Sequence, residues 1–295
     1  MATLTVATCQ FPVSADANAN RTWITKLIRK ARRDGADVVH FCEGALSGYA
    51  AADLPDYDGY DWATLEANAR LVFARAGELG VWLVVGSAHR LSGDHLPHNS
   101  VYVVNDRGEL VDRYDKRFCE PGYTPGDHAT EFEINGIRCA TLVCLEFRYP
   151  ELYRDYKRRG VDVVFHSFHA GNFTDERLAD SADGIGPAHL PLNAPTYPGT
   201  LMPSSMTAAA GANHVWISAA NTSAPYSCWG AFFVRADGIT TGRLPRHRAG
   251  VLLSTVDTDV DLYDSTRAGR GNAMAGILHS GDLVSDPRSA ARTEF

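Results

Sequence analysis

The sequence predicts an α/β fold in which strands and helices alternate and form one or more mixed sheets covered by helices. Short apolar runs rich in Val, Ile and Leu alternate with longer segments whose apolar residues recur at helical spacing. Residues 105–108 read Asn-Asp-Arg-Gly, a turn sequence between two apolar runs, which indicates a hairpin as well. Alternating strands and helices together with hairpins are typical of α/β proteins with mixed sheets.

The first half of the chain contains the two clearest helical patterns. Residues 20–33 place apolar side chains on one helical face with basic residues between them, and Gly35 follows. A second helix is predicted over residues 62–79, before Gly80. The expected strands of this half are residues 4–9, 37–42, 82–86, 100–104 and 110–111.

The second half follows the same plan. Helices are predicted over residues 149–159 and 202–212. The expected strands are residues 137–143, 161–165, 214–218, 231–234 and 251–253. No linker or short repeat interrupts the chain, so we expect one domain over residues 1–262. Residues 263–295 are rich in Gly, Ser and Arg, and we expect them to form an extended tail that packs on a partner subunit.

Composition and charge narrow the classes of function. Of the 295 residues, 45% are hydrophobic and 21% are charged, as in an ordinary globular protein and unlike a disordered one. A net charge of −7 provides no basic footprint for nucleic acid or an anionic membrane. No run approaches the ~20 apolar residues that span a bilayer, and the start lacks the basic region of a signal peptide. We therefore expect a cytoplasmic protein with one catalytic domain and reduced cysteines.

Three residues with catalytic potential stand at the ends of predicted strands. Glu43, Lys116 and Cys144 each follow a strand-like run. In α/β folds ligands collect at the ends of strands, so this placement favours a common site. A cysteine nucleophile needs a base that removes its proton and a neighbour that stabilises charge.

The three residue types can divide these roles. Glu43 can take the thiol proton and return it to a leaving amine. Lys116 and the backbone N–H of Leu145 can hold an oxyanion. Each residue alone is more often structural, because cysteines are commonly buried for packing and single charges at strand ends are usually solvated.

Three sequence blocks surround these residues in order. They are FCEGALSGY at residues 41–49, YDKRF at residues 114–118 and CLEFRYPE at residues 144–151. The chain therefore resembles the nitrilase superfamily of carbon–nitrogen hydrolases, whose motifs are a glutamate block with Gly-Tyr, a Tyr-x-Lys block and a cysteine block with Phe-Pro-Glu. The resemblance extends from residue 4 to about residue 256.

The resemblance implies an αββα four-layer sandwich, with two mixed β-sheets flanked by helices. It implies a triad of Cys144, Glu43 and Lys116, no cofactor, no metal, and a homodimer or larger homo-oligomer. The family's second glutamate, which helps to orient the attacking or leaving group, matches Glu120. Because Glu120 lies only four residues after Lys116, a loop that is longer in many members is short here, and one pocket wall should be reshaped.

The cysteine block combines features of different branches of the family. Leu145 and Glu146 replace the Tyr-Asp of amidases, and a Glu two residues after the nucleophile is reminiscent of nitrile-hydrolysing members. The next residues, RYPE at 148–151, resemble amidases and carbamoylases. We expect Arg148 and Glu151 to pair or to brace the nucleophile loop; if Arg148 reaches the pocket, it can bind a carboxylate.

Four residues are expected to contact substrate. His169 and Asn172 follow a strand on the pocket side, as substrate-contact loops of the family do. Tyr49 and Phe147, together with Trp229, suit an aromatic wall, and core packing explains these aromatic residues equally well.

Two further features are open to a functional reading. Residues 184–203 are rich in Pro and His and suit a lid or a pocket wall, with an ordinary surface excursion as the alternative. His166 and His169 lie three residues apart, but the pattern offers no third and fourth ligand at the spacing of a metal site.

The sequence therefore predicts a thiol-dependent hydrolase, similar to amidases and N-carbamoyl amidohydrolases. It would cleave a non-peptide C–N bond of a small amide or N-carbamoyl compound through a thioester on Cys144. Nitrile hydrolysis and acyl transfer are alternatives on the same triad. A non-catalytic small-molecule binding protein is the alternative from another class, and the joint presence of Glu43, Lys116 and Cys144 disfavours it. We expect neither a nucleic-acid nor a membrane partner.

Overall fold

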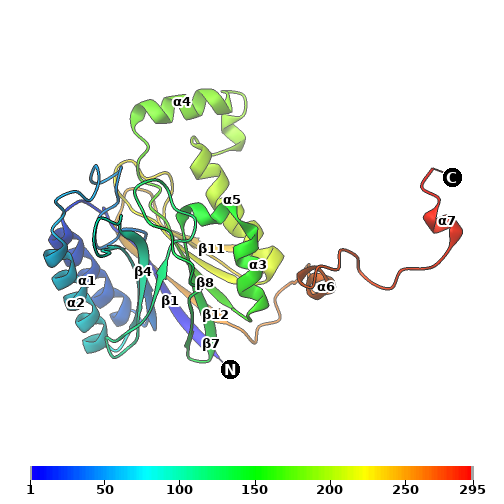
Figure 1. Cartoon of the computed structure of the whole chain (residues 1–295), viewed down its shortest axis with the longest axis horizontal. Coiled ribbons are helices and arrows are strands. Elements are labelled where there is room, and N and C mark those ends of the chain that lie inside the picture. The colour runs from blue at the N-terminus through cyan, green and yellow to red at the C-terminus, as the bar shows by residue number, and fades with distance from the viewer. Residues whose placement is uncertain (1, 294–295) are drawn as a thin grey trace.

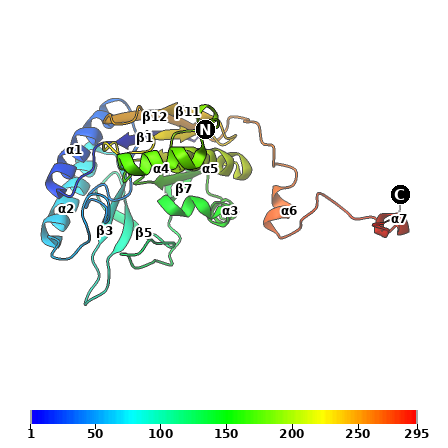
Figure 2. The same ribbon diagram turned by 90° about the horizontal axis from the view of Figure 1, so that it is seen from above.

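The computed structural model describes residues 2–293 and contains two six-stranded sheets packed against each other. Helices α1 (Ala17–Arg33) and α2 (Trp62–Leu79) cover the outer face of the first sheet (Figures 1 and 2). Helices α3 (Pro150–Arg158) and α5 (Tyr197–Asn213) cover the outer face of the second. The layers run helix, sheet, sheet, helix, which confirms the predicted αββα sandwich.

The first sheet has the strand order β12–β1–β2–β3–β4–β5. Strands β1, β2 and β3 are parallel, whereas β12, β4 and β5 are antiparallel to their neighbours. The central strands are apolar on both faces because helices cover one face and the second sheet covers the other. The bounds are β1 Thr3–Gln10, β2 Val38–His40, β3 Trp82–His89, β4 His98–Val104, β5 Leu110–Asp115 and β12 Gly250–Asp257.

The second sheet repeats this plan with the order β11–β10–β9–β8–β7–β6. Strands β7, β8 and β9 are parallel, and the flanking strands are antiparallel to their neighbours. The bounds are β6 Glu131–Ile134, β7 Ile137–Val143, β8 Val163–Ser167, β9 Trp216–Ala220, β10 Phe232–Val234 and β11 Thr240–Arg243.

Helices α1 and α2 begin at residues that satisfy their free backbone N–H groups. The Asp16 carboxylate accepts a hydrogen bond from Asn18 N at the start of α1, and the Asp61 carboxylate accepts one from Thr64 N at the start of α2. Gly80 ends α2 in the left-handed conformation. No helix among residues 2–293 combines the length and apolar composition that crossing a membrane requires. The shorter helices are η1 Cys144–Arg148, α4 Asp175–Ile185, η2 Leu190–Leu192, α6 Arg270–Met274 and α7 Pro287–Ala290.

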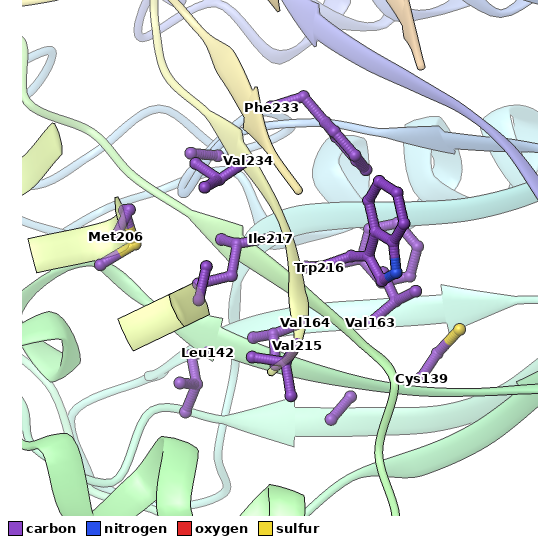
Figure 3. Close-up of a cluster of buried hydrophobic side chains, with 14 of the residues drawn as sticks. Cys139, Leu142, Val163, Val164, Met206, Val215, Trp216, Ile217, Phe233 and Val234 are labelled. Carbon is purple, nitrogen blue, oxygen red and sulfur yellow. The ribbon is translucent and has the colours of Figure 1, made fainter. Parts of the chain in front are cut away.

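The core of the second half is formed by side chains that alternate along its strands (Figure 3). Ile217 and Val234 lie on the side of Met206, which belongs to α5. Their chain neighbours Trp216 and Phe233 point to the opposite face, toward the other sheet. Because both faces are buried, these strands have nearly continuous apolar sequences.

A polar contact joins the two sheets close to the site. His40, at the end of β2, is fully buried. Its Nδ1 lies 2.8 Å from Ser218 Oγ of β9, and its Nε2 lies 2.9 Å from Ser167 Oγ of β8. Ser167 Oγ also donates to the Phe41 carbonyl at 3.1 Å. Because Phe41 precedes Glu43 by two residues, these bonds hold the strand end that carries Glu43 against the second sheet.

The chain leaves the sandwich after β12 (Figure 1). Thr266 Oγ1 donates to the carbonyl of Ala212 at 3.4 Å, and Asp264 forms an ion pair with Arg270 at 2.7 Å. The first residues beyond 262 therefore stay in contact with the end of α5. Beyond α6 the chain extends away from the body, and Leu278 is 89% exposed there.

Candidate active site

Glu43 lies in the turn that follows β2 and is fully buried. Its Oε1 accepts hydrogen bonds from Asn99 Nδ2 at 2.6 Å and from Lys116 Nζ at 3.0 Å. Its Oε2 accepts one from the backbone N–H of His169 at 2.9 Å. The carboxylate is therefore oriented by three donors from β4, the end of β5 and the end of β8.

Lys116 follows β5 directly, and its side chain is also fully buried. Its Nζ bridges two carboxylates, because it lies 3.0 Å from Glu43 Oε1 and 2.6 Å from Glu120 Oε2. Burial opposes the charge on the ammonium, but the surrounding negative charge, chiefly that of the Glu43 carboxylate, outweighs this effect and raises the pKa of Lys116. The ammonium is therefore retained at neutral pH.

Cys144 is the first residue after β7 and begins η1. Its φ of 42° lies in the left-handed region, which a residue with a side chain adopts only when the surrounding structure enforces it. Burial and the Glu43 carboxylate raise the pKa of the thiol well above its ordinary value, while Lys116 and the backbone N–H of His169 act in the opposite direction. The resting sulfur is therefore a thiol, and nucleophilic attack requires a base.

Glu146 stabilises the turn that carries Cys144. Its buried carboxylate accepts hydrogen bonds from Val143 N at 2.8 Å, Arg117 N at 2.8 Å and Tyr114 Oη at 2.7 Å. Burial raises the pKa of this carboxyl group, and these hydrogen bonds act against that rise. Glu146 is absent from the lining of the cavity described below, so its role is to tie the nucleophile turn to the loop after Lys116.

Cys144 opens onto a cavity of about 250 Å³. The structure brings eight of the residues singled out from the sequence to this cavity: Tyr49, Glu120, Cys144, Leu145, Phe147, Arg148, His169 and Asn172. Glu43 and Lys116 are outside the lining, since their side chains are fully buried in the wall. Tyr123 and Cys228 in the lining, and Asn99 beside Glu43, were not predicted from the sequence. Only Asn99 had a sequence signal, as a polar residue beside an apolar run.

Aromatic packing makes one wall of the cavity rigid. The Tyr49 ring stacks on the His169 ring with centroids 5.0 Å apart, and it packs against Tyr123 at a tilt of 31° with centroids 5.7 Å apart. His169 Nδ1 bonds to the Glu43 carbonyl at 3.3 Å, which orients the imidazole, and Asp53 Oδ2 lies 3.3 Å from its Nε2. Trp229, the third aromatic residue considered for the wall, packs in the core against Phe168, with ring centroids 4.9 Å apart, and is outside the lining.

The segment over 184–203 borders this cavity. It contains the end of α4, η2 and the start of α5, and Pro198 and Met202 contribute to the lining. Helix α4 projects from the body of the sandwich (Figure 1). The segment therefore forms part of the pocket wall.

Arg148 reaches the cavity and lies at its exposed rim. Its guanidinium carbon is 5.6 Å from the centre of the Phe147 ring. In the part of the chain that the structure describes, no ion pair joins Arg148 to Glu151 or to another acidic residue. The ion pair with Glu151, one of the two structural roles expected of Arg148, is therefore absent, and Arg148 instead fulfils the condition under which it can bind a carboxylate, a place at the pocket.

The histidines and cysteines near the site form no metal centre in residues 2–293: no three His, Cys, Asp or Glu side chains there are placed to hold an ion. His166 instead bonds to Tyr153 and to the carbonyl of Cys144. All six cysteines are free thiols. Cys119, which lies near Lys116, is not activated, because burial raises its pKa to about 12 against the effect of the lysine.

Comparison with protein families gives a match over most of the chain. The family model described as "Carbon-nitrogen hydrolase" matches residues 5–267. This range includes every residue of the site described above.

The individual relatives share about a quarter of their residues with this chain over the matched segments. The 2-oxoglutaramate amidase of Bacillus subtilis is 25% identical over 170 residues, which are 55% of this chain and 64% of that protein. The N-carbamoylputrescine amidase of Solanum lycopersicum is 25% identical over 198 residues, which are 61% of this chain and 63% of that protein. The match therefore spans less than two thirds of either relative.

Solved structures show the same architecture. A nitrilase-superfamily amidase from Nesterenkonia AN1 superimposes with a TM-score of 0.71 at 19% identity, covering 93% of this chain and 97% of that one. At this identity the likeness concerns the fold.

Proposed function

We propose that this chain, which belongs to the carbon–nitrogen hydrolase family of the nitrilase superfamily, hydrolyses a non-peptide C–N bond of a small amide or N-carbamoyl compound through a thioester on Cys144. One observation carries the proposal. Cys144 and Glu120 line the same cavity, and Glu120 forms an ion pair with Lys116, which in turn pairs with the buried Glu43. The amidase names of the relatives support the same reaction.

The first half of the reaction forms the thioester. Cys144 Sγ attacks the substrate carbonyl carbon while Glu43 takes the thiol proton. The resulting oxyanion is held by the Lys116 ammonium and the Leu145 backbone N–H. When the tetrahedral intermediate collapses, the C–N bond breaks, and Glu43 returns the proton to the leaving ammonia or amine.

The second half of the reaction releases the acid. A water attacks the thioester carbon, and Glu43 takes a proton from this water. Glu120, on the cavity wall beside Lys116, orients the water with its carboxylate. The C–S bond then breaks and the sulfur regains its proton, which restores the starting state.

The test is a screen of simple amides, N-carbamoyl amino acids, N-carbamoyl amines and nitriles with ammonia release as the signal. We expect turnover of an amide or carbamoyl compound, loss of turnover in Cys144→Ala and Cys144→Ser with the fold intact, inactivation by thiol alkylation, and no effect of chelators. Full activity in Cys144→Ala would contradict the proposal. Turnover of nitriles alone would favour the nitrile alternative on the same triad.

We further propose that the preferred substrate carries an anionic group away from the scissile bond. The cavity of about 250 Å³ lies below the range of roughly 300–1,000 Å³ that is typical of pockets for drug-sized ligands, so the substrate is small. Arg148 at the rim has no acidic partner among the described residues, and its guanidinium can bind a carboxylate in bidentate geometry.

The matched test compares an ω-carboxylate amide with the corresponding neutral amide of equal length. Arg148→Gln should raise KM for the anionic amide about tenfold or more and leave the neutral amide unchanged. Equal effects on both substrates would contradict a contact between Arg148 and the carboxylate.

We also propose a homo-oligomer in which residues 263–295 pack on a neighbouring copy, and a cytoplasmic location, for which six free thiols are suited. The exposed apolar side chains of the tail support the first proposal: Leu278, Leu283 and Val284 are 89%, 78% and 74% exposed. Removal of residues 276–295 should lower the mass measured by light scattering. An unchanged mass would contradict the role of the tail.

A further inference from the structure

The peptide group that joins Cys144 to Leu145 is anchored at its carbonyl oxygen. This oxygen lies 3.2 Å from His166 Nε2, and His166 Nδ1 lies 2.6 Å from Tyr153 Oη. All these side chains are buried, and His166 belongs to β8 whereas Tyr153 belongs to α3. The contact therefore connects the nucleophile turn to both the second sheet and the helix layer that covers it.

The direction of each hydrogen bond follows from the groups themselves. A carbonyl oxygen only accepts, so His166 Nε2 carries the proton and donates to Cys144 O. Burial keeps the imidazole neutral by lowering its pKa, so Nδ1 has a free lone pair and accepts from the Tyr153 hydroxyl. The ring also stacks on Phe168, with centroids 4.2 Å apart, which fixes its plane.

The anchored oxygen and the N–H of Leu145 belong to one rigid unit. A peptide group is planar, with its C=O and N–H pointing in opposite directions, so fixing the oxygen also fixes the direction of the N–H. A donor bound to the carbonyl oxygen also polarises the amide and strengthens its N–H as a donor. This support is needed because the positive φ of Cys144 gives the turn no intrinsic preference for its conformation.

We propose that His166, oriented by Tyr153, is a positioning residue that aims and polarises the Leu145 N–H toward the oxyanion. The proposal rests on the proposed function, since it takes the Leu145 N–H as an oxyanion donor. His166 touches neither substrate nor the Cys144 sulfur in this role and acts only through the peptide group.

The test separates two reactions of the same cysteine. p-Nitrophenyl acetate acylates Cys144 through a tetrahedral oxyanion and releases p-nitrophenol. Iodoacetamide alkylates it by direct displacement: the S–C bond forms, iodide leaves, and no oxyanion develops. Both reactions require loss of the thiol proton, so their ratio reports on the oxyanion site alone.

Tyr153→Phe and Tyr156→Phe form a matched pair of variants. Both tyrosines lie on α3 and are buried, and Tyr156 Oη donates to the Thr141 carbonyl of β7 at 3.0 Å. Tyr153→Phe should slow acylation about three- to tenfold and leave alkylation unchanged, because His166 loses the donor that fixes its ring. Tyr156→Phe should change neither rate, since the Thr141 carbonyl to which Tyr156 donates does not belong to the peptide group between Cys144 and Leu145.

Two variants of His166 extend the test. His166→Phe keeps the stacking on Phe168 and removes the donor, so acylation should slow about 10- to 100-fold, again without a change in alkylation. His166→Gln offers an amide N–H at the place of Nε2 and should recover part of this loss. If His166→Phe does not fold, Tyr153→Phe and His166→Gln carry the comparison.

Two results would overturn the proposal in different ways. Equal acylation in the wild type and in Tyr153→Phe, or a parallel loss of acylation and alkylation, would show that the contact is only structural. A wild type that is alkylated but never acylated would contradict the proposed function itself, and the proposal would fail with it.

Discussion

The two sheets hold their catalytic residues by different means. The first sheet contributes Glu43 and Lys116, whose opposite charges lie 3.0 Å apart in a fully buried wall. The second sheet contributes Cys144, and its turn is held through the main chain: Glu146 accepts from Val143 N, and His166 donates to the Cys144 carbonyl. The first sheet thus holds its catalytic residues by opposite charges, whereas the second sheet holds its catalytic residue by hydrogen bonds to the backbone.

This difference predicts different costs of substitution. Removing one member of a buried ion pair leaves an uncompensated charge, so both stability and catalysis suffer. Loosening a backbone turn removes no catalytic group. It displaces the groups that the turn carries by a small distance, and this misalignment lowers the rate of the reaction. The predictions below use this contrast.

The largest effect is expected for Lys116→Met. This change removes the oxyanion cation and leaves Glu43 as a buried carboxylate with no ammonium beside it. The rate constant kcat should fall about 10³-fold, and the free energy of unfolding should fall by about 3–5 kcal/mol, as measured by steady-state kinetics and urea unfolding. The exposed pair of Lys30 with Asp34 provides the control, because Lys30→Met should change the free energy of unfolding far less than Lys116→Met. A kcat of Lys116→Met equal to that of the wild type would contradict the role of the Lys116 ammonium in holding the oxyanion.

Glu146→Gln tests the side of the site that is held by the backbone. The amide keeps the size of the side chain, but in either orientation its NH₂ group faces one of two backbone N–H donors, Val143 N or Arg117 N, which donate to different oxygens of Glu146. We expect kcat to fall about 10- to 100-fold and stability to fall by about 1–3 kcal/mol, since one buried donor loses its acceptor. Unchanged kinetics together with lowered stability would show that the turn does not depend on this carboxylate for alignment.

His40→Gln tests the contact between the two sheets through its pH dependence. Burial lowers the pKa of His40 to about 3, so the unfolded chain binds this proton below pH 6.5 and the folded chain does not. The contribution of neutral His40 to the free energy of unfolding is therefore complete above pH 6.5 and is lost as the pH falls toward 3.

The measurement is the free energy of unfolding at pH 6.5 and pH 4.5. Over this interval the wild type should lose about 2 kcal/mol more than His40→Gln. His95→Gln, at an exposed position, should behave like the wild type. An identical pH dependence in His40→Gln would mean that His40 does not titrate as its burial requires.

Local patterns predicted the α/β class and the runs that precede the central residues, whereas the four-layer sandwich was implied by the resemblance to the nitrilase superfamily. The apolar run that became β7 ends just before Cys144, as predicted, and the run before Glu43 became β2, which ends two residues earlier than predicted, at His40. The edge strands β6 and β11 were missed because they are short, and β11 has the largely exposed sequence TTGR. Helix α4 was missed because it buries only Ser181 and has few apolar residues that reveal its period.

The contacts that were missed or misjudged come from residues far apart in the chain. Glu146 meets Arg117 and Tyr114 across about 30 positions, and Asn99 meets Glu43 across 56. The spacing of Arg148 and Glu151 suggested a pair, but the two side chains form no ion pair in the described structure. Pairings of this kind depend on how the two sheets pack, which local periodicity does not encode.

The most direct test of the account is the mass of the protein during turnover. The wild type is mixed with p-nitrophenyl acetate, quenched in acid within milliseconds and digested for peptide mapping. We predict a mass gain of one acetyl group on Cys144, which is absent in Cys144→Ala and disappears as the thioester hydrolyses. An adduct on Cys119, or release of product with Cys144 unmodified, would contradict the proposed nucleophile.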